Sequence, residues 1–255
     1  MSTVGEVGGA QSVDRAITVL EIIAARSEAS VAEIATEVGV HRSTVSRLLS
    51  ALEGRGMVEV AGSRGRYRLG SGLLRLASSV SGPLDVTVQG AEICERLAAE
   101  LGETVNIAVT RGDSAVNVYQ AAGSGAITVD SWVGRPTPLH ATSSGKILLA
   151  SFDDRALEAA LARRLDAFTP QTVTDPVELV RQLVEARSRG FAVTIGELEE
   201  GLNAIAAPVR GAGGSVVAAL STSAPGYRLT AIAIPAHAAA VVAAAAEVSR
   251  RMGYR

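Results

Sequence analysis

The sequence predicts an α+β protein with two domains, a small N-terminal domain of helices and one hairpin, and a larger domain built around a β-sheet. Apolar residues recur at helical spacing over residues 12–56, and the period changes to strand alternation over residues 57–69. From residue 86 onward, stretches with strand character are interleaved with helical ones. With 255 residues, of which 47% are hydrophobic and 20% charged, the chain is long enough for two ordinary globular domains.

Composition excludes several other classes of protein. No stretch reaches the roughly 18 consecutive apolar residues that a membrane span needs. Residues 1–11 lack the basic flank and apolar run of a secretory signal, so we expect a cytoplasmic protein with a flexible tail there. Cys94 is the only cysteine, which excludes an intrachain disulfide and a multi-cysteine metal cluster. His41, His140 and His237 are far apart in sequence and give no support for a metal site, and we expect no cofactor.

Charge is distributed unevenly along the chain. The net charge of −2 by itself argues against non-specific binding to nucleic acid. Residues 41–75, however, carry seven arginines against two glutamates, whereas the segments before and after are both net acidic. This local basic segment, rather than the total charge, indicates a nucleic-acid partner.

The first two helices carry recognisable caps. Ser12 is a plausible N-cap for a helix that ends near Arg26. Ser30, with Glu33 three residues later, matches the capping box of a second helix, and Gly39 is placed to end it. A third helix follows after one short turn, so the pair forms a helix-turn-helix, whose second helix reads DNA.

That third helix has two distinct faces. Val45, Leu48, Leu49 and Leu52 fall at i, i+3, i+4 and i+7 and form the core face. The opposite face is rich in hydrogen-bond donors and contains no acid; the residues expected to contact DNA are Arg42, Ser43, Thr44, Ser46 and Arg47. The alternative is an ordinary solvated face, but such a face normally mixes glutamate with lysine.

A basic hairpin follows the helix pair. Residues 57–69 read as two strands joined by a turn at residues 62–65, with Arg64, Arg66 and Arg68 on and beside its tip. Residues 12–70 therefore form a winged helix-turn-helix, whose wing contacts the DNA backbone or minor groove. Residues 71–85 are expected to be a linker helix that is broken at Pro83.

The second domain, residues 86–255, is predicted as a sheet covered by helices on at least one face. Gly102 is expected to end its first helix. The expected strands are residues 104–110, 115–121, 126–133, 191–196, 203–210 and 216–223, and the expected helices are residues 86–101, 143–152, 175–190 and 235–252.

One short motif in this domain could carry chemistry. Ser143-Ser144-Gly145-Lys146 fits the S-x-x-K pattern of Ser–Lys acyl enzymes. Lys146 is the only lysine of the chain, so the K-T-G element that those enzymes also require is absent. What remains is a polar turn that opens a helix, where free backbone N–H groups favour an anion such as a carboxylate. The alternative is that Ser143 and Ser144 merely cap the helix.

Three stretches together resemble the IclR-type transcriptional regulators of bacteria. They are the helix-turn-helix SVAEIATEVGVHRSTVSRLLSALEGRGMVE, the turn LHATSSGKILLA, and RGFAVTIGELEEGLNAIAAPVRGAGGSVVAALSTSAP. The resemblance implies a repressor or activator that binds a palindromic double-stranded DNA operator as a homodimer or a dimer of dimers. It also implies that residues 86–255 form a GAF-like domain that holds a small organic effector.

The same resemblance implies a lining for the effector pocket. The lining consists of the turn amides of Ser143 and Ser144 together with Thr194, Leu202, Ala204, Ser221 and Ser223. Thr194 stands where relatives of this type can have an acid and Ala204 where they can have a cysteine, which suggests a somewhat larger effector, with an aromatic acid as one candidate. Glu197 and Gly201 match the family's E-x-x-x-G element, which we interpret as structural.

Two alternatives to an effector-responsive regulator follow from the same residues. One is a Ser–Lys hydrolase, with Ser143 or Ser144 as nucleophile and Lys146 as base, fused to a DNA-binding module. The other is a DNA-binding protein that responds to no effector. The missing K-T-G element disfavours the first, so no catalytic residue is expected, and the polar turn disfavours the second.

Overall fold

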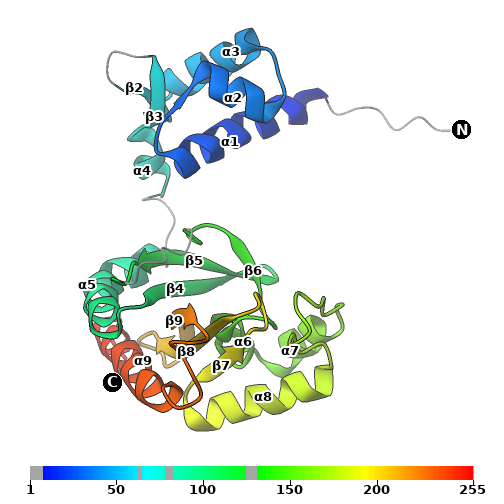
Figure 1. The fold of residues 1–255 in the computed structure, drawn as a ribbon, viewed down its shortest axis with the longest axis vertical. Helices are drawn as coiled ribbons and strands as arrows, with labels where there is room; N and C mark the ends of the chain where they lie inside the picture. The colour runs from blue at the N-terminus through cyan, green and yellow to red at the C-terminus, as the bar shows by residue number, and fades with distance from the viewer. Residues whose placement is uncertain (1–7, 62–64, 78–82, 125–130, 255) are drawn as a thin grey trace, which may run out of the picture. The chain divides into compact units, whose positions relative to one another are not determined.

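The computed structural model describes residues 8–61, 65–77, 83–124 and 131–254 (Figure 1). The chain divides into two compact units, residues 1–81 and residues 82–255. The division falls inside the segment expected to be the linker.

The N-terminal unit is a winged helix-turn-helix. Its elements are α1 (Gly8–Arg26), β1 (Ala29–Ser30), α2 (Val31–Val38), α3 (Arg42–Glu53), β2 (Val58–Ala61), β3 (Arg66–Leu69) and α4 (Gly72–Ala77). The strands form an antiparallel sheet in the order β1-β3-β2. Helices α1, α2 and α3 bury one shared apolar cluster that includes Ile23, Ile34 and Leu49.

Local sequence explains most of these boundaries. The Ser30 hydroxyl accepts a hydrogen bond from the Glu33 amide, and the Glu33 carboxylate accepts one from the Ser30 amide, so the capping box is confirmed. Gly39, at φ +72°, ends α2 in the left-handed conformation that favours glycine. Ser12 is not the N-cap of α1, because the helix extends to Gly8 and includes residues 8–11 of the expected tail.

One strand of this unit was not expected. The two-residue strand β1 pairs with β3, where Ala29 lies opposite Tyr67 and Ser30 opposite Arg66. Two residues are too few to show an alternating pattern, so sequence periodicity could not reveal it.

The C-terminal unit is built on a six-stranded antiparallel sheet in the order β6-β5-β4-β9-β8-β7. The strands are β4 (Thr104–Arg111), β5 (Ser114–Ala121), β6 (Pro136–Pro138), β7 (Ala192–Ile195), β8 (Leu202–Arg210) and β9 (Val216–Pro225). The helices are α5 (Pro83–Leu101), α6 (Ser143–Leu149), α7 (Asp154–Leu161), α8 (Pro176–Arg189) and α9 (Ile234–Arg251).

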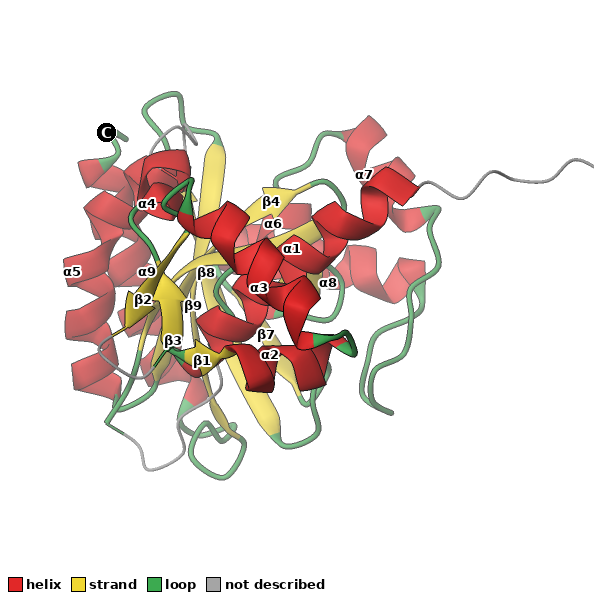
Figure 2. Ribbon diagram, turned by 90° about the horizontal axis from the view of Figure 1, so that it is seen from above, coloured by secondary structure: helices red, strands yellow, loops and turns green. Residues whose placement is uncertain are grey.

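Helices cover both faces of this sheet. On one face α5 and α9 lie side by side and bury Ile107, Ile205 and Leu220 (Figures 1 and 2). On the other face α6 and α8 pack against smaller residues, among them Ala206 and Ala219. Neighbouring residues of a strand point to opposite faces of the sheet. Large apolar residues on one face therefore pack against α5 and α9, and small ones on the other face pack against α6 and α8.

Three expectations for this unit are corrected. The predicted strand 126–133 falls partly outside the described residues, and of its remainder only Val133 makes a single bridge, to Asn117. The edge strand is instead β6, where prolines are tolerated because one side of an edge strand has no partner. Pro83 begins α5 rather than breaking a helix, since a first-turn proline loses no hydrogen bond. Helix α7 was not expected at all.

Candidate functional site

Helix α3 separates an apolar face from a polar one. Val45 and Leu49 are fully buried, as the periodicity predicts. Arg42, Ser43, Ser46 and Arg47 are exposed on the opposite face, and Thr44 is half-buried. The Nδ1 of the N-cap residue His41 accepts the amide hydrogen of Ser43 at 3.3 Å, which fixes the start of the helix.

The arginines of α3 and of the wing differ in their partners. Within the described residues, no carboxylate lies within salt-bridge distance of Arg42 or Arg47. By contrast, Arg66 donates to the backbone oxygen of Glu28 at 2.9 Å and lies 3.2 Å from the Glu33 carboxylate.

The other wing arginines add to this contrast. Arg68 donates to Glu59 at 2.7 Å. Arg64 lies outside the described residues. The described wing arginines are therefore paired within their own domain, whereas the α3 arginines are available to an external anion.

All seven residues expected to line an effector pocket lie around one cavity of about 70 Å³. These are Ser143, Ser144, Thr194, Leu202, Ala204, Ser221 and Ser223. We call this cavity the sheet pocket. Its remaining lining residues, which the sequence did not indicate, are Asn106, Asn117, Trp132, Thr137, Ala141, Thr142 and Leu198.

Strand register explains how the sheet side of the pocket is built. Ser221 lies opposite Asn106 of β4. Ser223 lies opposite Ala204 of β8, which in turn lies opposite Thr194 of β7. Alternate residues of each strand share a face, so these side chains, from four neighbouring strands, lie on the side of the sheet that α6 covers. An asparagine between the apolar residues Val105 and Ile107 was the available signal for Asn106.

The first turn of α6 forms the facing wall. Its N-cap is Thr142, whose hydroxyl accepts the amide hydrogen of Gly145 at 3.1 Å, so the alternative that Ser143 and Ser144 cap the helix is wrong. Ser143 and Ser144 are instead the first two residues of α6. Amide groups in the first turn of a helix have no hydrogen-bond acceptor within the helix, so these two can bind a ligand.

Gly145 is required by a close approach of backbone. A Cβ placed there would lie 2.3 Å from the carbonyl oxygen of Leu139. Only glycine therefore allows the first turn of α6 to lie this close to the segment that follows β6.

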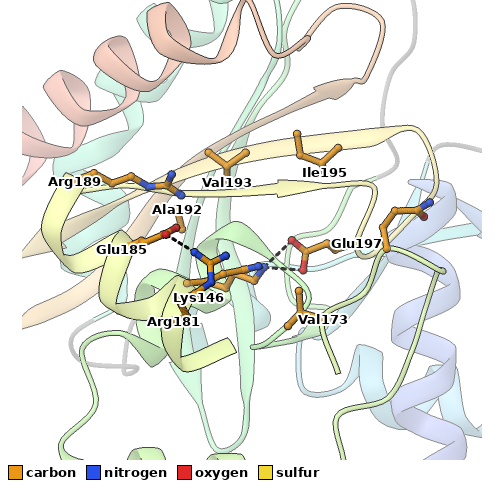
Figure 3. Close-up of a pocket in the computed structure, with 11 residues that line it drawn as sticks. Lys146, Val173, Arg181, Glu185, Arg189, Ala192, Val193, Ile195 and Glu197 are labelled. Atoms are coloured by element: carbon orange, nitrogen blue, oxygen red, sulfur yellow. Dashed lines mark hydrogen bonds and ion pairs between the residues drawn. The ribbon is translucent and has the colours of Figure 1, made fainter. Parts of the chain in front are cut away.

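Lys146 is not among the residues that line the sheet pocket, and its side chain lies in a separate cavity that Arg181 and Glu185 also line (Figure 3). Its Nζ donates to both Glu197 carboxylate oxygens, at 2.6 and 2.7 Å, and to Gln182 at 2.7 Å. An ammonium has three donors, and this geometry uses them all. Burial lowers the pKa of Lys146, and the facing Glu197 carboxylate opposes that shift.

The Ser–Lys hydrolase alternative has no geometric support. Lys146 is occupied by Glu197 and Gln182, so it is not positioned as a base for Ser143 or Ser144.

Glu197 has the structural role expected of it. It holds the loop between β7 and β8 to α6 through Lys146, and the next residue, Leu198, lines the sheet pocket. Gly201, at φ +78°, allows the turn that leads into β8.

The histidines make local contacts. His140 pairs with the backbone oxygen of Asp166 and His237 with that of Ala233. Among the residues that the structure describes, no three potential ligands gather into a metal site. None of the described helices combines the length and apolar character needed to cross a bilayer.

Two family models match the chain. The model described as the IclR helix-turn-helix domain matches residues 12–62. The model described as the C-terminal region of the bacterial transcriptional regulator IclR matches residues 79–250.

Characterised relatives and solved structures are similar over most of the chain. It is 33% identical over 249 residues to the HTH-type transcriptional regulator BhcR of Paracoccus denitrificans, covering 97% of this chain and 89% of that protein. It is 35% identical to the HTH-type transcriptional repressor AllR of Klebsiella pneumoniae, covering 87% and 82%. The crystal structure of an IclR homologue from Microbacterium hydrocarbonoxydans, complexed with 4-hydroxybenzoate, matches with a TM-score of 0.76 at 28% identity, covering 94% of this chain and 98% of that one.

Proposed function

Because the chain belongs to the IclR family of bacterial transcriptional regulators, we propose that it binds a palindromic operator as a dimer or dimer of dimers and that a small organic carboxylate in the sheet pocket modulates this binding. It is a DNA-binding regulator rather than an enzyme, as its relatives are. Residues 12–70 contact DNA, residues 86–255 hold the effector and residues 71–85 link them. The protein works in the cytoplasm, where the operator is accessible.

The DNA contacts of this proposal centre on α3. Arg42, Ser43, Thr44, Ser46 and Arg47 enter the major groove. The exposure of all of them but Thr44 supports this, as does the absence of a carboxylate partner for either arginine among the described residues. Wing residues Arg64, Arg66 and Arg68 contact phosphates. To do so, Arg66 must release Glu33 and Arg68 must release Glu59.

The convergence of the seven expected lining residues on one cavity is the observation that carries the effector proposal. The amides of Ser143 and Ser144 bind the carboxylate, because the described lining of the pocket contains no charged side chain that could do so. The 4-hydroxybenzoate bound by the Microbacterium homologue makes an aromatic acid one candidate. The small volume of the cavity makes compact acids candidates as well.

Operator affinity with and without candidate acids tests this proposal. Ser143→Ala and Ser144→Ala should keep the response, because backbone amides bind the carboxylate. Ala204→Phe and Ser221→Leu should lose the response, because bulk fills the pocket, while their operator affinity without acid is unchanged. Effector coupling is typically about 1–3 kcal/mol, or roughly 5- to 150-fold in affinity. A normal response in both bulky variants would place the effector elsewhere.

The operator itself should be recovered from genomic DNA by the full-length protein under native conditions. The genes beside it identify the regulated pathway and narrow the set of acids to be tested. Recovered fragments without a shared inverted repeat would contradict palindromic recognition.

A further inference from the structure

Asn106 presents a buried acceptor with no partner. The side chain lies on β4, is 6% exposed and lines the sheet pocket. Among the fully buried side-chain nitrogen and oxygen atoms of the described residues, its Oδ1 alone lacks a hydrogen-bond partner. Buried polar groups are nearly always paired, so an exception requires an explanation.

Neither cross-strand neighbour of Asn106 donates a hydrogen bond to its Oδ1. On β9 it lies opposite Ser221, and on β5 opposite Gln120, whose side-chain oxygen is already bound to the amide of Trp132. The adjacent residues Val105 and Ile107 are buried in the apolar core on the other face. The unliganded protein would therefore be more stable with an apolar residue at position 106. A residue that lowers stability in the wall of a cavity is typical of a binding site.

A second carboxamide lies near it. Asn117 of β5 lines the same pocket and is half-buried, and no hydrogen bond from its side chain is present among the described residues. The sheet wall thus offers two carboxamides, whereas the facing wall offers the amides of Ser143 and Ser144. An acid that spans the pocket meets amide donors on one side and carboxamides on the other.

We propose that Asn106 is a specificity-determining residue that hydrogen-bonds a hydroxyl group of the effector, so that the effector is a hydroxy-substituted carboxylate. This inference rests on the proposed function. A hydroxyl donates to Oδ1 and accepts from Nδ2, so it satisfies the carboxamide in either orientation. An ammonium group is disfavoured, because the described lining contains no acid to balance its charge. A site built to bond a hydroxyl rejects the analogue that lacks it.

Thermal unfolding of the unliganded full-length protein tests whether Asn106 is truly unpaired. Asn203 is the matched control, because it is 7% exposed on β8 and its Nδ2 donates to the Leu229 oxygen at 2.9 Å. Asn106→Leu should leave the Tm unchanged or raise it. Asn203→Leu should lower the Tm by at least about 2 °C, since it leaves a buried carbonyl unpaired. An equal loss in both variants would overturn the proposal, because Asn106 would then be a structural residue.

Binding of matched acids tests the specificity. Calorimetric Kd values are compared for acetate and glycolate, propionate and lactate, and benzoate and 4-hydroxybenzoate. Emission from Trp132, the only tryptophan of the chain, reports binding in this pocket. In at least one pair the hydroxy acid should bind the wild type at least about tenfold more tightly, a difference of about 1.4 kcal/mol. In Asn106→Leu that ratio should fall below about threefold, and Ser221→Leu should bind neither acid.

The outcomes separate this inference from the function on which it rests. Saturable binding that Ser221→Leu abolishes, but without a hydroxyl preference in the wild type, would overturn the role of Asn106 and leave the effector pocket supported. A hydroxyl preference that persists in Asn106→Leu would likewise overturn the role of Asn106 and leave the effector pocket supported. Absence of binding by all six acids would contradict both the inference and the carboxylate effector.

Discussion

At the scale of single residues, the two groups of arginines in the N-terminal unit have different partners, so their replacement should affect stability differently. Arg47 is exposed on α3 without a carboxylate partner among the described residues. Arg47→Ala should weaken operator binding and, if one phosphate contact is lost, reduce the slope of log K against log salt by about 0.9. Fluorescence anisotropy at several salt concentrations measures this slope. The Tm should not change, and an unchanged affinity at all salt concentrations would contradict the assignment of this face.

Arg66 should differ from Arg47 in its effect on stability, in addition to the phosphate contact proposed for it. Its guanidinium joins β3 to the Glu28 carbonyl and to the Glu33 carboxylate at the start of α2. Arg66→Ala should therefore lower the free energy of unfolding by about 1 kcal/mol, as loss of one hydrogen bond and one partly exposed ion pair implies. Urea unfolding measures the change, with Arg47→Ala as the stability control. Equal stability of the two variants would show that these Arg66 contacts contribute nothing.

The buried pair of Lys146 and Glu197 gives a second prediction about stability. Lys146→Met should destabilise the C-terminal unit by about 3–5 kcal/mol, because it leaves the Glu197 carboxylate buried without a counter-charge. Replacing both residues, as Lys146→Met with Glu197→Leu, should recover most of that loss. Chemical denaturation of the single and double variants makes the comparison. A double variant as unstable as the single one would indicate that packing, not charge, dominates here.

At the scale of elements, the position of α6 depends on one glycine. Gly145→Ala introduces a Cβ that meets the Leu139 carbonyl, so the first turn of α6 must move. We expect a loss of about 1–3 kcal/mol of stability and a loss of the effector response, with operator binding retained. Gly213→Ala is the control, because a Cβ there meets no atom within 4 Å. An intact response in Gly145→Ala would show that the pocket does not depend on this turn.

At the scale of the whole molecule, we expect copies of the chain to associate through exposed apolar residues of the N-terminal unit. Val13 and Ile17 of α1 are 60% and 51% exposed, and Leu74 of α4 is 73% exposed. Recognition of a palindrome needs a two-fold axis, so we expect these helices to form a dimer contact. Ile17→Glu should increase the dimer dissociation constant at least tenfold, whereas Val177→Glu on α8 should not. Light scattering at micromolar concentration measures the association, and a strict monomer with and without operator would contradict it.

The sequence by itself determined the two-unit α+β organisation, the capping box of α2 and the two faces of α3. These features depend on residues within a few positions of one another, so their pattern is visible in the chain. The polar turn indicated Ser143 and Ser144, and resemblance to a family, rather than spacing, added five further residues that line the sheet pocket.

Only the tertiary structure decided which polar side chains have partners. Lys146 bonds Glu197, 51 positions away, and Arg66 bonds Glu33, 33 positions away. Because these partners are distant in sequence, local pattern could not show where either side chain points. The absence of a partner for Asn106 depends on what two neighbouring strands place beside it. Local periodicity fixes which face a side chain occupies, but its hydrogen-bond partners come from distant segments that meet only when the sheet and its covering helices assemble.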